Sequence, residues 1–200
     1  MIATRIGRMN IHITGASGSG VTTLGKALAQ ELGSLHLDID DYFWMPTDPP
    51  YTTKRPRELR LALLREAFAR ASGTGWVLSG SILEWGDPLI PLFDLAIFVS
   101  TPTELRLQRL RAREAVQFGA EAIAPGGSRH KEHEWFIAYA AAYDEEKHEG
   151  RSRARHEALL AQLPCPVLRL DGSLPISALV QQVISKLGQL SELSQLPQRL

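Results

Sequence analysis

The residues with the clearest chemical meaning form a glycine-rich segment near the N-terminus, Gly15–Thr23 (GASGSGVTT). A phosphate loop consists of a glycine, four further residues, a second glycine, a lysine, and then a serine or threonine. Gly15, Gly20 and Thr22 match this spacing, but Val21 stands where the lysine belongs. Glycines let the backbone curl so that successive N–H groups point at phosphate oxygens, and the following helix adds its positive end.

The segment therefore predicts a site for a phosphate-bearing nucleotide, with the Thr22 hydroxyl as a ligand for Mg²⁺. A glycine-rich turn without a ligand is the simpler alternative. The residues expected to bind the nucleotide are Gly15, Ser17, Gly18, Ser19, Gly20, Val21, Thr22 and Thr23.

Val21 leaves this segment without the cation that normally reaches the β- and γ-phosphates. Losing one preorganised donor to developing charge costs about 2.7–4 kcal/mol, or roughly 10²–10³ in rate. Three consequences are open: another cation reaches the phosphates, turnover is slow, or the protein binds nucleotide without catalysis. Arginines from a mobile segment are better candidates for the replacement than Lys26, which lies about 140° around the helix axis.

Three carboxylates, Asp38, Asp40 and Asp41, lie at the end of a short segment that reads as the second strand. Ligands of open α/β sheets bind at the carboxyl ends of the strands. A carboxylate in that place can orient or deprotonate an acceptor hydroxyl. Capping of a loop by aspartate is the alternative, and it accounts for at least one of the three.

Three segments together resemble the adenylate kinase/shikimate kinase group of P-loop kinases: Gly15–Gly25, Leu37–Trp44 (LDIDDYFW) and an arginine-bearing segment at 103–114 (TELRLQRLRARE). The joint occurrence of residues 40–44 (DDYFW), residues 134–136 (EWF) and Tyr143 is similar to an uncharacterised branch of this group. Members of that branch carry names such as adenylate kinase-like or DNA topology modulation protein. The resemblance spans most of the chain. It implies transfer of the γ-phosphoryl group of ATP, with Mg²⁺, to a nucleoside monophosphate, a small hydroxylated metabolite or an antibiotic.

The resemblance also implies roles at the acidic cluster and beside it. Asp38 would help hold Mg²⁺ through water, and Asp40 would receive the acceptor hydroxyl. Arg55 or Arg57 would hold the anionic group of the acceptor, although a solvated helix start is an equal alternative. Gly80, after the third strand, would lie against the acceptor. Asp41 and Trp44 complete the expected acceptor site.

Two arginines of the 103–114 segment, Arg109 and Arg113, lie four residues apart and therefore share one helical face. In the related kinases such a pair stacks on the base and reaches phosphate, tasks that suit a guanidinium group. A basic solvated face is the alternative. We expect these two arginines to take over the charge of the missing lysine when the lid closes.

The expected elements alternate between strands and helices, which predicts a parallel sheet with helices on both faces. We expect a three-layer P-loop kinase fold whose sheet has five strands in order 2-3-1-4-5. We expect one domain, 1–187, with an acceptor-binding segment at 42–72, a lid at 114–131 and a disordered or partner-binding tail at 188–200. The strands are expected at 9–14, 35–38, 76–79, 94–99 and 166–170, and the later helices at 56–72, from 102, 132–147, 152–162 and 175–187.

Composition limits the class of protein. The 200 residues carry a formal net charge of zero, which argues against nucleic acid held by bulk charge. No stretch is long and apolar enough for a membrane span, and the single cysteine, Cys165, fits a reducing compartment as a buried thiol. We therefore expect a cytoplasmic monomer or homodimer whose partner is a small-molecule or nucleotide acceptor.

Two rival functions remain open. A nucleotide sensor without catalysis is favoured by Val21, whereas the carboxylates and arginines argue for a kinase. A short-chain dehydrogenase is suggested by Gly15–Gly20 and by Tyr143 and Lys147, which match a Tyr-x-x-x-Lys pair. The glycine offsets of 0, 3 and 5 differ from the 0, 4 and 6 of that family, which disfavours the dehydrogenase.

Overall fold

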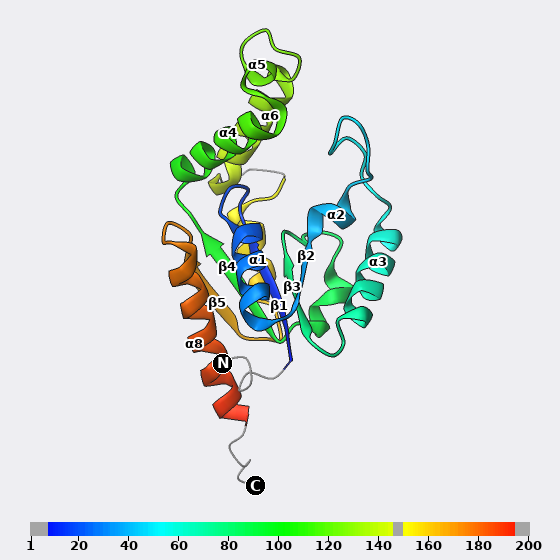
Figure 1. Cartoon of the computed structure of the whole chain (residues 1–200), viewed down its shortest axis with the longest axis vertical. Helices are drawn as coiled ribbons and strands as arrows, with labels where there is room; N and C mark the ends of the chain where they lie inside the picture. The colour runs from blue at the N-terminus through cyan, green and yellow to red at the C-terminus, as the bar shows by residue number, and fades with distance from the viewer. Residues whose placement is uncertain (1–7, 146–149, 195–200) are drawn as a thin grey trace.

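The computed structural model describes residues 8–145 and 150–194 and consists of a single parallel sheet between helical layers (Figure 1). The strands are β1 Met9–Gly15, β2 Leu35–Asp38, β3 Gly75–Ser79, β4 Leu95–Ser100 and β5 Val167–Asp171. The helices are α1 Val21–Leu32, α2 Ile39–Phe43, α3 Arg57–Arg70, α4 Thr103–Phe118, α5 Ala120–Ile123, α6 His130–Ala141, α7 Arg153–Leu160 and α8 Ile176–Ser194, with short 3-10 helices η1 Asp87–Leu92 and η2 Ala142–Asp144.

The sheet has the predicted order, β2-β3-β1-β4-β5, and every pair is parallel. The last residues of the central strands lie side by side, since Ile13 is paired with Ser79 and Gly15 with Val99. All five carboxyl ends therefore meet at one edge. This fold is the predicted P-loop kinase fold.

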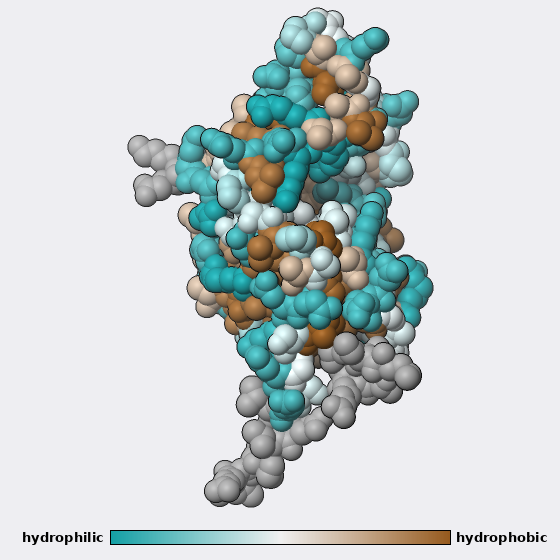
Figure 2. Space-filling model, turned by 60° about the vertical axis from the view of Figure 1, so that its left-hand side comes forward, coloured by the Kyte–Doolittle hydropathy of each residue, from teal (hydrophilic) through white to brown (hydrophobic). Residues whose placement is uncertain are grey.

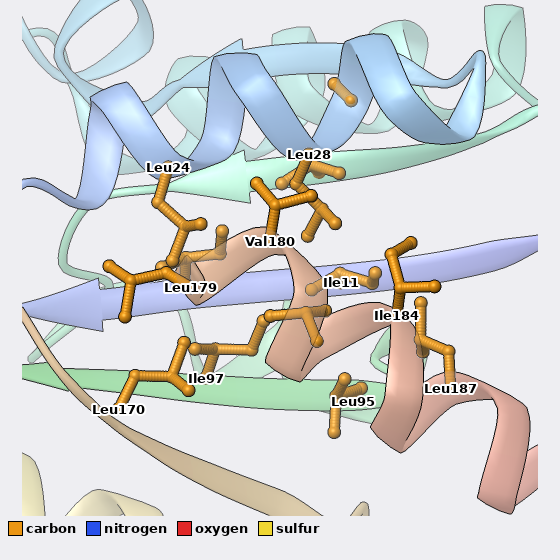
Figure 3. Packing of buried hydrophobic residues seen from close by; sticks show 14 of the residues in the cluster. Ile11, Leu24, Leu28, Leu95, Ile97, Leu170, Leu179, Val180, Ile184 and Leu187 are labelled. Atoms are coloured by element: carbon orange, nitrogen blue, oxygen red, sulfur yellow. The ribbon is translucent and has the colours of Figure 1, made fainter. Parts of the chain in front are cut away.

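The two faces of β1 bury different side chains because successive residues of a strand point to opposite faces. Ile11 and Ile13 lie on one face, in a core formed with α1 and α8. Figure 3 shows Leu24 and Leu28 of α1 and Leu179, Val180, Ile184 and Leu187 of α8 directed at the strands. His12 and Thr14, by contrast, lie fully buried on the opposite face.

That opposite face is covered by α3, η1 and α7. Leu64 and Phe68 of α3 pack with Trp76 and Leu78 of β3, and the Phe68 and Trp76 rings stack at 4.0 Å. Leu160 of α7 packs on Ala96 and Phe98 of β4. Cys165 is partly buried beside both clusters, as expected of a structural thiol, and burial raises the pKa of its thiol.

The C-terminal helix corrects one expectation. α8 continues to Ser194 instead of ending at 187, so 188–194 is helix and not a disordered tail; residues 195–200 lie outside the described part. The reason is that Leu187 is buried and Leu190 packs on the same core, which extends the apolar face past Gly188. A stripe at 183, 184, 187 and 190 follows helical spacing, whereas the leucines at 190, 193, 196 and 200 alone do not.

The lid also differs from its predicted limits. α4 runs to Phe118, α5 lies inside the expected small-residue loop, and α6 ends at Ala141 rather than at 147. In the space-filling view the lid forms an upper lobe with mixed hydrophilic and hydrophobic surface (Figure 2). Within residues 8–145 and 150–194 no helix is long and apolar enough to cross a membrane.

Candidate active site

A cavity of about 1470 Å³ lies at the carboxyl edge of the sheet. Its floor is the segment between β1 and α1. Two segments project from the body on this side of the sheet (Figure 1): the lid arm, defined here as 113–141, and the acceptor arm, defined as 39–56. Side chains from both arms line the cavity, so that ligands bound here would lie between two walls that are separate in sequence.

The floor has the backbone of a phosphate loop. Gly18 and Gly20 take left-handed φ values of 80° and 97°, a conformation that other residues adopt at a cost, and Gly20 is the N-cap of α1. Gly15 has no room for a side chain, because a Cβ there would lie 2.6 Å from the Val99 carbonyl oxygen. Seven of the eight predicted nucleotide-binding residues line the cavity.

Ser19 is the exception among them. Its side chain is buried below the loop, and within the described part of the chain its hydroxyl has no hydrogen-bond partner. Its Oγ atom would lie 2.7 Å from a Cβ on Gly15, and Val21 Cγ1 would lie 3.3 Å from the same point. The Ser19 backbone N–H donates to the Ala16 carbonyl at 3.1 Å and so closes the turn of the loop, and the Val21 side chain packs close to Gly15.

The acidic cluster lies on the acceptor side of the floor. Asp38, Asp40 and Asp41 all line the cavity. Asp38 also caps α2, because its Oδ1 atom accepts a hydrogen bond from the Asp40 N–H at 3.1 Å, so capping and a functional role coexist in one residue. Desolvation by the cavity walls and the charge of Asp38 raise the pKa of Asp40, and the positive charges of Arg151 and Arg113 oppose that rise. A carboxyl with a raised pKa is a suitable proton acceptor near neutral pH.

The arginines of α4 divide into two kinds. Arg106 is fully buried and structural: its guanidinium donates to the Ala140 carbonyl at 2.9 Å and the Ser17 carbonyl at 3.4 Å, and it pairs with Asp144 at 3.1 Å. Arg109 and Arg113 line the cavity, as predicted. Arg109 Nη1 donates to the Gly172 carbonyl at 3.0 Å and would lie 3.9 Å from a Cβ on Gly20, beside the phosphate loop.

Arg55 and Arg57, the expected anion holders, do not line the cavity. Arg55 Nη1 donates to the Tyr42 carbonyl at 3.2 Å, and Arg57 Nε donates to the Trp85 carbonyl at 3.0 Å. Both guanidinium groups therefore fasten backbone segments of the acceptor arm and of the loop after β3. Gly80, Asp41 and Trp44, by contrast, line the cavity where they were expected.

Arg60 lines the cavity instead, and the sequence interpretation missed it. The residue is only 8% exposed, and its guanidinium lies over the Phe43 ring at 3.8 Å and the Trp85 ring at 5.4 Å. Its Nε donates to the Arg55 carbonyl at 2.6 Å, but within residues 8–145 and 150–194 no carboxylate pairs with it. A buried guanidinium without an acid partner is costly unless an anion compensates it, so its two terminal nitrogens suit a carboxylate or phosphate.

Aromatic rings cover both arms. Trp44 and Tyr51 of the acceptor arm meet edge to face at 6.1 Å, and Tyr51 is 48% exposed. Trp135 of the lid arm is 66% exposed and stacks on Tyr139 at 5.4 Å. All four rings line the cavity and give each wall an apolar surface.

Arg151 is the second residue that the sequence interpretation left without a definite role. It lines the cavity and lies near enough to Asp40 to lower the pKa of that carboxyl. Its backbone N–H donates to the Tyr139 hydroxyl at 2.9 Å, which fixes the chain at the start of α7. No local pattern marks Arg151, because its position depends on the lid fold.

Tyr143 does not behave as the tyrosine of a dehydrogenase would. It is buried against His156, and burial raises the pKa of its phenol, whereas a catalytic tyrosine needs an accessible group that ionises more easily. Lys147, the other half of the expected pair, lies outside the described residues. With the fold established, the dehydrogenase alternative loses its basis.

Comparison with known proteins agrees with the phosphate loop and the sheet order. Residues 11–119, more than half of the chain, match a family model described as "AAA domain". The chain belongs to the AAA domain family. It is also 41% identical over 181 residues to the uncharacterized protein YqaC of Bacillus subtilis (strain 168), across 90% of this chain and 98% of that protein.

Solved structures extend the comparison to the fold. A shikimate kinase from Acinetobacter baumannii in complex with shikimate has a TM-score of 0.52 at 16% identity, covering 98% of this chain and 99% of that one. A gluconokinase from Sinorhizobium meliloti 1021 has a TM-score of 0.50 at 16% identity, covering 94% of each chain. Both similarities show that this chain shares its fold with small-molecule kinases.

Proposed function

We propose that this protein is an ATP-dependent phosphotransferase that moves the γ-phosphoryl group to the hydroxyl of a small anionic acceptor. The observation that carries the proposal is the coincidence, in one cavity, of a phosphate loop, a carboxylate with a raised pKa at Asp40, and the acid-free buried guanidinium of Arg60. A phosphate loop alone would serve a sensor equally well. The other two groups fit an acceptor.

The nucleotide would bind with its phosphates in the phosphate loop. Backbone N–H groups at 15–20 and the positive end of α1 supply donors that do not depend on the missing lysine. Arg109, which joins Gly172 to the region of Gly20, would lie against the nucleotide on the lid side. We expect binding that is weaker than in a lysine-bearing loop but measurable.

The residues present fit Mg²⁺ in the way nucleotide enzymes usually bind it. Thr22 and Asp38 line the same floor and offer one hydroxyl and one carboxylate, and Mg²⁺ commonly takes one or two carboxylates together with substrate phosphates and water. No cluster of three acidic, histidine or cysteine residues able to hold a metal occurs among the described residues, which agrees with a metal carried by the nucleotide. Bound there, Mg²⁺ would neutralise developing phosphate charge.

The transfer itself needs a base and cations. The acceptor hydroxyl oxygen forms a bond to the γ-phosphorus, the bond to the bridging oxygen of ADP breaks, and the hydroxyl proton passes to Asp40. Arg113 and Arg151, whose charges act on Asp40, face this point from the lid side. They are our candidates for the cations that stabilise the transferring group in place of the absent lysine.

The acceptor site indicates a class of compound. Arg60 fits a carboxylate or phosphate, and Lys54, whose Nζ lies 5.9 Å from the Phe43 ring, adds a second cation to that end. Trp44 and Tyr51 offer apolar surface to the body of the molecule. A hydroxylated acid with a ring or an apolar body suits these groups better than a fully polar chain does.

The decisive experiment combines binding with an acceptor screen. Calorimetry should detect ATP–Mg²⁺, and a coupled ADP-release assay should find turnover with hydroxy acids as acceptors. Arg60→Met should raise the acceptor KM by about 30-fold or more, as loss of a charge-assisted pair costs on the order of 2–5 kcal/mol, while the ATP Kd stays unchanged. Arg65→Met, at an exposed position of the same helix, is the matched control.

The competing function is a nucleotide sensor, and Val21 is the observation that favours it. ATP binding without ADP release for any acceptor class, together with no effect of Arg60→Met on ATP binding or ADP release, would establish the sensor instead. Failure to bind ATP, GTP or inorganic phosphate with Mg²⁺ would refute both functions.

A further inference from the structure

A buried hydrogen-bond junction lies behind the cavity, centred on His156 of α7. His156 Nε2 lies 3.0 Å from Ser81 Oγ and 3.2 Å from Thr14 Oγ1, and His156 Nδ1 lies 2.8 Å from the Tyr143 hydroxyl. All four residues are at most 5% exposed. The ring also packs edge-on against Phe98, at 6.1 Å between centroids, so its orientation is fixed on every side.

The three partners belong to three different parts of the proposed active site. Thr14 immediately precedes Gly15, the first residue of the phosphate loop. Ser81 immediately follows Gly80 and lines the acceptor side of the cavity. Tyr143 lies in η2, directly after the last helix of the lid arm. One imidazole therefore contacts groups that the chain separates by 62 residues or more.

The two nitrogens of a neutral imidazole make different kinds of hydrogen bond, so the two sides of the His156 ring are not equivalent. Burial lowers the pKa of His156 to about 3, so the ring is uncharged near neutral pH and has one N–H donor and one acceptor nitrogen. Nδ1 contacts Tyr143 at the base of the lid, and Nε2 contacts Ser81 and Thr14 beside the acceptor loop and the phosphate loop. The two links can therefore be removed separately by substitution.

A second link joins the lid only to the phosphate loop. Arg106 connects the Ala140 carbonyl with the Ser17 carbonyl, and its guanidinium lies 5.2 Å from the Tyr143 ring. Neither Arg106 contact reaches the loop at Gly80 and Ser81. Within the described residues, His156 is the side chain that joins all three parts.

We propose that His156 is a positioning residue that transmits nucleotide binding at the phosphate loop to the acceptor loop and to the base of the lid. The inference rests on the proposed function, because it takes the phosphate loop to bind a nucleotide. Phosphates bound at Gly15–Gly20 would restrict the loop that begins directly after Thr14. The junction then holds Ser81 and Tyr143 in the arrangement that the acceptor and the closed lid require.

Two conservative substitutions can separate the two links. The amide nitrogen of His156→Gln falls near the position of Nε2 and can still reach Ser81 and Thr14, but not Tyr143. The amide nitrogen of His156→Asn falls near Nδ1 and can still reach Tyr143, but not Ser81 or Thr14. Tyr143→Phe removes the lid link from the other side and should repeat the effect of His156→Gln.

The measurement is hydrogen exchange of the full-length protein with and without ADP–Mg²⁺. In the native protein ADP should slow exchange at the phosphate loop, at 80–86 and at 138–145. His156→Gln and Tyr143→Phe should lose the ADP-induced protection at 138–145 alone, and His156→Asn should lose it at 80–86 alone. Each loss should be about fivefold to tenfold in rate, the effect of one net hydrogen bond.

The outcomes distinguish the two proposals. Absence of ADP protection anywhere in the native protein would refute the nucleotide site and the inference with it. Protection confined to the phosphate loop in the native protein would refute the inference alone. Equal loss at both remote segments in every variant would mean that His156 only stabilises the fold, which also overturns the positioning role.

Discussion

The two most deeply buried imidazoles should make the fold sensitive to mild acid. His12 and His156 are both 0% exposed, and burial lowers the pKa of His12 to about 4 and the pKa of His156 to about 3. In the unfolded chain both pKa values return to about 6.5. Below that pH the unfolded state binds protons that the folded state excludes, so the free energy of unfolding decreases as the pH falls.

The size of the effect follows from these pKa values. Between pH 7 and pH 5 each histidine should lower the free energy of unfolding by about 1.8 kcal/mol, and the pair by about 3.6 kcal/mol. The loss continues until the folded pKa is reached, about 4 for His12 and about 3 for His156. Against a typical total of about 5–15 kcal/mol, such a loss is a large fraction.

Denaturant unfolding at pH 7, 6 and 5 measures this loss. Gln does not titrate, so His156→Gln should start less stable at pH 7 but lose about 1.8 kcal/mol less than the native protein on going to pH 5. His12→Gln is the matched second variant and should likewise lose about 1.8 kcal/mol less than the native protein. The reasoning is refuted if the native protein and His156→Gln lose the same stability.

Three further predictions concern the cavity. Asp40→Asn should lower phosphoryl transfer by about 10²-fold or more while sparing the ATP Kd; an unchanged rate would end the role of Asp40 as the base. Because desolvation and Asp38 raise the pKa of Asp40, turnover should fall with decreasing pH at values above the ordinary carboxyl range near 4, and a rate that stays flat down to that range would contradict this. Val21→Lys should change turnover only modestly, whereas Arg113→Ala should lower it by about 10²-fold; a hundredfold gain in the first with no effect in the second would favour the sensor.

Features that depend on short stretches of sequence were predicted well. The phosphate loop is defined by glycine spacing within nine residues, and its backbone takes the left-handed angles that only glycine adopts cheaply. The parallel sheet follows from the alternation of elements, and the strand order follows from the resemblance to P-loop kinases that the loop after the first strand carries. Asp38 and Asp40 line the cavity because the end of a parallel strand fixes where the next residues lie, whereas their roles stay predictions.

Features that depend on side-chain direction were missed. Arg55 and Arg57 fit the expected place in the chain, but their side chains point at backbone carbonyls. Arg60 was overlooked although a signal exists: it lies four residues before Leu64 and seven before Ala67, on the buried face of α3. A guanidinium on an apolar helical face requires a partner, and the rings of Phe43 and Trp85 that hold it come from other elements.

The substitution at Val21 changes where the positive charge of the site resides, and this bears on whether the protein is a kinase or a sensor. A lysine in the phosphate loop is present at the phosphates in every conformation. Here the cations that line the cavity come instead from outside the loop, among them Arg109 and Arg113 of α4 and Arg151. The attraction between unit charges is about 4 kcal/mol at 4 Å and an effective dielectric of 20, and half of that at 8 Å, so an arginine carried by the lid arm, such as Arg113, contributes its full effect only when that arm lies close to the phosphates. Turnover should therefore depend on lid closure more steeply than in a lysine-bearing kinase. On the proposed function, the protein with an open lid should bind nucleotide as a sensor would, and phosphoryl transfer is expected only when the lid lies over the nucleotide.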